Sequence, residues 1–162
     1  IHEQTLGLEH NITGITATNL GLLLLNQGSY VASEPLLRRA LAIAKKAKGP
    51  NSEDVLARCC NLGRVLRKAG KLAEAEIELL KGVDLGERFQ KGRPFIELSE
   101  LRVQQNQLDA AEILLKRALE IIRSTLPASD EAIAEAVEKL AALYDRMGRT
   151  AEAEALRRSA DK

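Results

Sequence analysis

Few side chains in this 162-residue sequence have types and spacings that suit covalent or metal chemistry. Cys60 stands one helical turn before Arg64, and a nearby cation can lower a thiol pKa, so a reactive thiol is one interpretation of this pair. A free cysteine is more often a small apolar filler, and that interpretation is favoured. His2 and His10 are eight residues apart and no cysteine lies near them, so they form no recognisable metal-ligand set. We therefore expect no catalytic residue, metal or cofactor, and we do not expect an enzyme.

Asn19 and Asn61 indicate a different chemistry, hydrogen bonding to a bound peptide. Each stands just before a leucine in a repeated Asn-Leu-Gly triplet. Asparagine has poor helix propensity and is not needed for packing there, so we expect these amides to bond a peptide backbone. A solvated amide is the alternative. A peptide-binding groove is implied by the family resemblance that the internal repeats carry. Helical spacing around the core leucines assigns to it Ile15, Thr18, Asn19, Leu22, Leu25, Asn61, Arg64, Arg67, Lys68 and Arg93.

The predicted groove changes character along its length. An apolar part comes first, and a basic part follows, since no acidic residue occurs from Val55 to Gly70. The ligand expected from this pattern is an extended peptide of a partner protein, with a large apolar residue flanked by Asp or Glu. For any single cation, an ordinary solvated surface charge is the alternative interpretation.

Composition restricts the classes of protein that need be considered. Apolar residues make up 45% of the chain, aromatic residues 2%, and the net charge is +1. Abundant Ala, Leu, Glu, Lys and Arg favour an all-helical protein, while the near-neutral charge favours neither nucleic acid nor a membrane surface as partner. Two adjacent cysteines are poorly placed for a disulfide, so a reducing, cytoplasmic setting is expected. The first residue is Ile1 rather than Met, and we expect a piece of a longer protein.

Internal repeats supply the elements that position these residues. The Asn-Leu-Gly triplet recurs after 42 residues, and turn residues follow at Gly28, Gly70, Asn106 and Gly148, with steps of 42, 36 and 42. Seven residues before each turn residue the chain places a small side chain: Gly21, Gly63, Ser99 and Ala141. A second set of small residues follows each turn, at Ser33, Ala75, Ala111 and Ala153. We expect the two helices of each hairpin to approach closely at these positions.

The repeats predict eight helices in one array over residues 1–162. The predicted helices cover 14–27, 30–47, 53–69, 72–88, 94–105, 108–124, 130–147 and 150–160. Residues 1–13 are expected to hold the tail of a preceding repeat and a loop, and the repeats to span 14–55, 56–91, 92–133 and 134–162. Leucines just before the small residues, such as Leu20 and Leu62, are expected in the core. The shortened third linker should change the pitch of the array locally, and Arg157, at a stacking position, should mark its capped end.

The pattern "NLGLLLLNQGSYVASEPLLRRALAIAKKAKGPNSEDV" resembles tetratricopeptide repeats, in the 42-residue form of kinesin light chains and their bacterial relatives. This resemblance implies a right-handed superhelical solenoid of antiparallel helix hairpins. It also implies a scaffold or adaptor that binds protein partners without catalysis. The carboxylate clamp of chaperone-binding members is not expected, because Thr18 and Leu22 stand at its first two positions.

Two further functions stay open at this level. The chain could associate with itself or pack on other parts of its own protein, like the sensor arm of a signalling protein, through Ile15, Leu22 and Leu25. RNA binding by a helical repeat is a weaker alternative, because the chain has few aromatic residues on which bases could stack.

Overall fold

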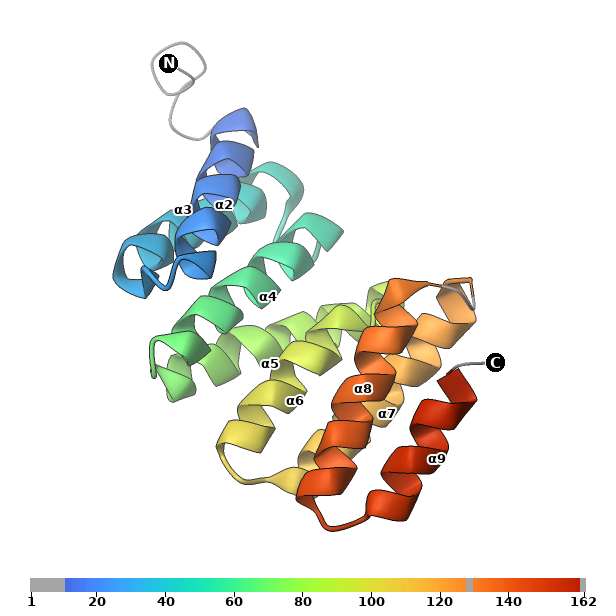
Figure 1. Ribbon diagram of the computed structural model, residues 1–162. Coiled ribbons are helices and arrows are strands. Elements are labelled where there is room, and N and C mark those ends of the chain that lie inside the picture. Colours follow the sequence, from blue (N-terminus) through green and yellow to red (C-terminus); the bar gives the residue numbers. More distant parts are fainter. Residues whose placement is uncertain (1–10, 128–129, 161–162) are drawn as a thin grey trace. The chain divides into compact units, whose positions relative to one another are not determined.

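The computed structural model describes residues 11–127 and 130–160, and in these residues it contains eight helices and no strand (Figure 1). The helices are α2 (Asn11–Asn26), α3 (Tyr30–Lys48), α4 (Glu53–Lys68), α5 (Leu72–Phe89), α6 (Arg93–Gln104), α7 (Leu108–Thr125), α8 (Glu131–Arg146) and α9 (Thr150–Ala160). Each predicted helix is confirmed with bounds within three residues. Of the tail and loop predicted for residues 1–13, residues 1–10 lie outside the described residues, and α2 already begins at Asn11.

The four turn residues are held in the same backbone conformation. Gly28, Gly70 and Gly148 have φ of 77°, 80° and 77°, and Asn106 reaches 59°. Glycine and asparagine are the residues that adopt this left-handed conformation at least cost. In each hairpin the residue after the turn residue donates its backbone N–H to a carbonyl five residues earlier, as Lys71 does to Leu66 at 2.9 Å. These bonds satisfy carbonyls at the helix end and fix the reversal of the chain.

The small residues of the hairpins pack as the repeats predicted. A Cβ on Gly21 would lie 2.8 Å from the side chain of Leu37, and one on Gly63 would lie 2.5 Å from that of Leu79. Ser33, from the second set of small residues, donates its hydroxyl to the Gly21 carbonyl at 2.6 Å. Close approach of the paired helices therefore requires these glycines.

The chain divides into two compact units, residues 1–85 and 86–162, and the boundary falls within α5. Unit 1 contains α2, α3, α4 and most of α5, and α3 packs against both α2 and α4. Unit 2 contains the end of α5 and the helices α6 to α9. In unit 2, α7 packs against both α6 and α8, and α8 packs against α9.

The shortened step between the second and third turn residues falls mainly on α6. Helix α6 has 12 residues, whereas α2, α4 and α8 each have 16. All four helices end within two residues of their turn residues, so the difference lies at the N-terminus. Helix α6 thus lacks the first turn that the corresponding helices have.

One predicted core residue is exposed. Leu62, Leu98 and Leu140 are buried, but the equivalent Leu20 is 46% exposed, and Leu23 on the same side of α2 is 54% exposed. In the described part of unit 1, α2 packs chiefly against α3 and touches α4 only slightly, so no helix covers this side. Burial of Leu20 was a wrong prediction, because the repeat pattern does not say whether a neighbour is present.

Candidate functional site

Six of the predicted groove residues lie on corresponding faces of α2 and α4. We define the inner stripe as the positions thirteen, nine, six and two residues before each turn residue. In unit 1 it consists of Ile15, Asn19, Leu22 and Asn26 on α2, and of Ala57, Asn61, Arg64 and Lys68 on α4. These positions follow one another at three- and four-residue intervals, which keep them on one side of a helix. All eight side chains are at least partly exposed.

The two amides of the stripe are available to a ligand. Asn19 is exposed and Asn61 is partly exposed. In residues 11–127 and 130–160, neither side chain makes a hydrogen bond. A primary amide offers both a donor and an acceptor, which is what the backbone of an extended peptide requires.

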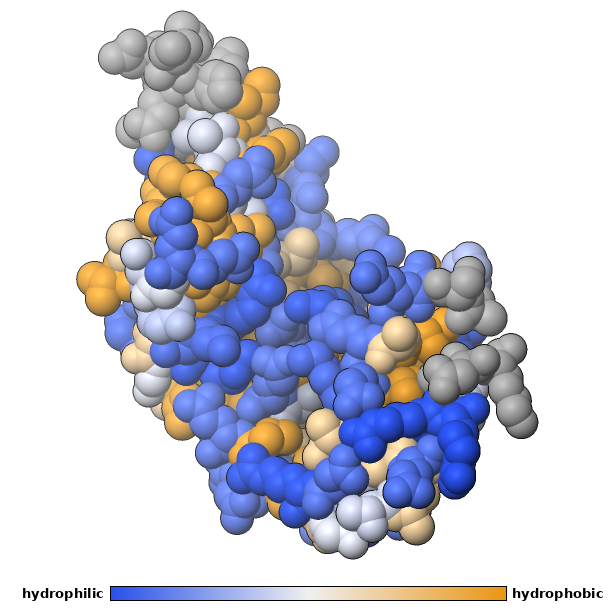
Figure 2. Space-filling view, in the orientation of Figure 1, coloured by the Kyte–Doolittle hydropathy of each residue, from blue (hydrophilic) through white to orange (hydrophobic). Residues whose placement is uncertain are grey.

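The stripe also changes from apolar to basic between its two helices. Helix α2 carries no charged residue, whereas α4 carries no acidic residue after Asp54 and has Arg64 and Lys68 in the stripe. Hydrophobic atoms gather over α2 and hydrophilic atoms over α4 in the space-filling view (Figure 2). The predicted apolar and basic parts are thus present on neighbouring helices of unit 1.

Two predicted groove residues on α2 are buried instead. Thr18 is 5% exposed and donates its hydroxyl to the Gly14 carbonyl at 2.8 Å, and Leu25 is 6% exposed. Both share a face of α2 with Gly14 and Gly21, which pack against α3. Helical spacing placed them about one position too far round the helix, so their assignment to the groove surface is corrected.

Arg67 is also buried, with 7% of its surface exposed. It stands four residues after Gly63, which packs against Leu79 of α5, and therefore lies on the α5-facing side of α4. Its prediction as a ligand-binding cation is wrong for this geometrical reason.

Arg93 belongs to unit 2, where carboxylates already bind it. Its guanidinium lies 2.9 Å from Glu97 on the same helix and 2.9 Å from Glu135 on α8. Burial alone would lower the pKa of Arg93, but the charges of Glu97 and Glu135 outweigh it and raise the pKa. An acidic ligand would have to displace these partners, so the structure does not favour the role predicted for Arg93.

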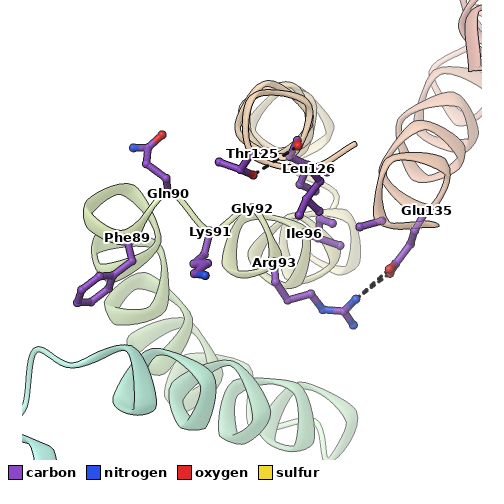
Figure 3. Close-up of a pocket in the computed structure, with 11 residues that line it drawn as sticks. Phe89, Gln90, Lys91, Gly92, Arg93, Ile96, Thr125, Leu126 and Glu135 are labelled. Atoms are coloured by element: carbon purple, nitrogen blue, oxygen red, sulfur yellow. Dashed lines mark hydrogen bonds and ion pairs between the residues drawn. The ribbon is translucent and has the colours of Figure 1, made fainter. Parts of the chain in front are cut away.

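A pocket of about 340 Å³ opens at the N-terminus of α6 (Figure 3). Its lining residues are Phe89, Gln90, Lys91, Gly92, Arg93, Ile96, Ile122, Thr125, Leu126, Ala132 and Glu135, all in unit 2. Figure 3 shows Arg93 reaching towards Glu135, while Ile96 and Leu126 lie close together. The sequence did not predict this pocket; its one signal was the 36-residue step between the second and third turn residues.

The two cysteines lie in the interior of unit 1. Cys59 is fully buried, and burial, together with the charge of Glu78, raises the pKa of its thiol to about 12. Cys60 is 6% exposed. Thiols placed in this way act as small apolar fillers, which agrees with the favoured interpretation of Cys60.

Other classes of site are not found in the described parts of the chain. Among residues 11–127 and 130–160 no group of three or more His, Cys, Asp or Glu could hold a metal ion. Both histidines lie outside this region. No described helix is long and apolar enough to span a bilayer.

Comparison with known proteins places these features in a family context. The tetratricopeptide repeat family matches residues 1–88. No curated protein matches significantly. A proposed kinesin light chain of Podosopora anserina with nearly identical TPR-like repeats superposes with a TM-score of 0.79, at 21% identity over 93% of this chain and 74% of its own. BtubC (BKLC) of P. vanneervenii gives a TM-score of 0.77, at 20% identity over 91% of this chain and 61% of its own. These similarities confirm the predicted helical-hairpin solenoid fold.

Proposed function

Because this chain belongs to the tetratricopeptide repeat family, we propose that it binds a short segment of a partner protein on the inner stripe of unit 1. The observation that carries this proposal is the pair of amides, Asn19 and Asn61, which make no hydrogen bond within the described residues. The two amides occupy equivalent positions on neighbouring helices. Each amide can donate a hydrogen bond to a backbone carbonyl of an extended segment and accept one from a backbone N–H.

The surroundings of the amides define the side chains of the ligand. Ile15 and Leu22 offer apolar contact on α2, and Arg64 and Lys68 offer positive charge on α4. The preferred segment has one large apolar residue flanked by Asp or Glu. Exposed ion pairs contribute only about 0–1 kcal/mol each, so the apolar anchor supplies most of the affinity and the cations set orientation and salt dependence. We expect micromolar binding, about −8 kcal/mol.

A peptide library screened at two ionic strengths tests the proposal. The test variant is the double substitution Arg64→Glu and Lys68→Glu. The matched control is Ala142→Glu and Arg146→Glu, which places charge at the same two positions on α8 in unit 2. Acidic-apolar peptides should bind the test variant at least tenfold more weakly, with less dependence on salt, and bind the control like the parent. Equal binding to parent and test variant would show that the stripe is not the binding surface.

The exposed face of α2 favours a second candidate function, association with another copy of the chain. Leu20 and Leu23 are 46% and 54% exposed, whereas the equivalent Leu62 and Val65 of α4 are 1% and 0% exposed. Since α2 has no charged residue, two copies could pair through it without repulsion between like charges. The interface would then use Leu20 and Leu23 rather than Leu25, which is buried.

Sedimentation equilibrium over a range of concentrations distinguishes the two functions. A dimer that Leu20→Glu with Leu23→Glu converts to a monomer would support self-association. A parent that remains monomeric at millimolar concentration would exclude it. We further propose a cytoplasmic location, which fits the two free and buried cysteines.

A further inference from the structure

The missing first turn of α6 removes a buried side chain that the other hairpins have. Fifteen residues before the turn residue, α2, α4 and α8 carry Thr13, Val55 and Ile133, with exposed fractions of 3%, 0% and 8%. All three side chains are β-branched. In the third hairpin the same position is Lys91, which is exposed and lies in the linker before α6. The third hairpin therefore has no branched side chain of its own at this position.

The 340 Å³ pocket lies where that turn is missing. Lys91, Gly92 and Arg93 form its wall on the α6 side, and Ile122 and Leu126 form the wall at the end of α7. Ile96 and Ala132 complete an apolar lining. Ile96 and Ile122 are almost fully buried, at 1% and 4%, while Leu126 is 39% exposed at the mouth. A cavity lined in this way offers water few hydrogen bonds and favours apolar atoms.

Gly92 lets the linker pass directly against α7 beside the pocket. A Cβ at this position would lie 2.5 Å from the side chain of Ile122 and 2.9 Å from the backbone carbonyl of Ala118. The chain therefore passes α7 at the closest distance that a residue without a side chain allows. The other two linker residues, Gln90 and Lys91, are exposed and line the pocket.

The charges at the rim indicate which neighbours the bound side chain can have. Arg93 and Glu135 face each other across the rim at 2.9 Å, and Lys139 adds a second cation at 3.9 Å from Glu135. A ligand charge of either sign would compete with an existing ion pair. Uncharged flanking residues meet no such competition, in contrast to the acidic flanks expected for unit 1.

We propose that this pocket binds a branched apolar side chain, Ile, Val or Leu, of a partner protein, in the position that Val55 and Ile133 fill in their own hairpins. The inference rests on the proposed function only in that the occupant belongs to a protein partner. It adds a second site with its own specificity, an apolar residue in an uncharged segment.

Methyl and amide NMR spectra of the full 162-residue chain provide the test. The probe is an uncharged, end-capped hexapeptide with a central isoleucine, and its counterpart with alanine is the control peptide. The isoleucine peptide should shift the signals of Ile96, Ile122 and Ala132, and the alanine peptide should bind at least tenfold more weakly. Equal shifts from both peptides, or shifts confined to other regions, would overturn the proposal.

Substitutions in the pocket complete the experiment. Ala132→Leu fills the pocket and should weaken binding of the isoleucine peptide at least tenfold. Ala142→Leu, on the exposed side of the same helix, should leave that binding unchanged. If Ala132→Leu does not fold, Leu126→Asp at the partly exposed mouth replaces it, with the same expectation. Undiminished binding to the folded pocket variant would overturn the proposal. The double substitution Arg64→Glu and Lys68→Glu should leave binding of the isoleucine peptide unchanged. The stripe proposal and the pocket proposal can therefore be disproved independently of each other.

Discussion

The inner stripes of the two units occupy corresponding positions but carry different kinds of side chain. In unit 1 the stripe has apolar and amide side chains on α2 and cations on α4. In unit 2 the same positions are Arg93, Glu97, Glu100 and Gln104 on α6 and Glu135, Lys139, Ala142 and Arg146 on α8. Ion pairs join these residues to one another: Arg93 binds Glu97 and Glu135, and Lys139 binds Glu100 and Glu135. Ion pairs between stripe residues on α6 and α8 thus stabilise unit 2, whereas the stripe of unit 1 carries no acidic residue that could form such pairs within it.

The ion pairs between successive hairpins show the reverse, because both units repeat one arrangement there. Six residues after the turn residue, Glu34 in unit 1 and Glu112 in unit 2 each form ion pairs with two cationic side chains. One cation stands four residues later on the same helix, and the other is the first residue after the next hairpin's turn residue. Positions that join successive hairpins therefore carry the same charges in both units, while the stripe positions differ between the units.

The strongest test of this contrast removes Arg93, which binds two carboxylates in the stripe of unit 2. Arg93→Met should lower the free energy of unfolding by about 1–3 kcal/mol, since it leaves the buried Glu97 without its closest cation. The estimate is below that for a fully buried pair because the Arg93 side chain is 47% exposed. Ile15→Met, at the same position in unit 1, should change stability by less than about 0.5 kcal/mol. Urea denaturation of both variants measures the difference, and equal losses would contradict the contrast.

A second test concerns the small residues that close the hairpins. Gly63→Ala should destabilise the chain by about 1–2 kcal/mol, because the added Cβ would lie 2.5 Å from the Leu79 side chain. This loss should appear although alanine is the better helix former by about 1 kcal/mol. Unit 2 has Ser99 at the same position, so a Cβ already fits there, and Ser99→Ala should be nearly neutral. A Gly63→Ala protein as stable as the parent would show that Leu79 can move aside without cost.

Local signals explain why the helices were predictable. Turn glycines, small residues and apolar spacing all act within one hairpin, and each repeat confirmed the register of the others. The pairing of Gly63 with Leu79 follows from the same short-range geometry. What depends on neighbours was harder: Leu20 aligns with Leu62, but only packing between hairpins decides which of them is buried.

The candidate site was predicted less completely for a related reason. Helical spacing separates faces by about 100° per residue, so it could not distinguish the inner stripe from the hairpin interface for Thr18 and Arg67. The partners of Arg93 include Glu135, 42 residues away, and no local pattern pairs them. The pocket arises from residues that are absent from α6, and the shortened step in the repeats was expected only to change the pitch.

The smallest expected effect concerns the arrangement that the two units share. Hydrogen bonds from Arg149 and Lys116 lower the pKa of Glu112 from 4.5 to about 2. Because the folded pKa lies below the unfolded one, the stabilisation is complete above pH 4.5, declines as the pH falls, and is gone below about pH 2. Hydrogen bonds from Lys71 and Arg38 also lower the pKa of Glu34 despite its partial burial, so unit 1 should respond in the same direction.

Glu112→Gln isolates this contribution. The variant should lose about 0.5–1 kcal/mol at pH 7, as expected for a partly exposed ion pair, and its stability should change less than that of the parent between pH 4.5 and 2. Glu34→Gln is the matched variant in unit 1, and its profile should flatten in the same sense. Thermal denaturation at pH 7, 4.5, 3 and 2 measures both. If the parent and Glu112→Gln lose stability in parallel over this range, the carboxylate of Glu112 is not held by its two cations, and the common arrangement is not a stabilising link between hairpins.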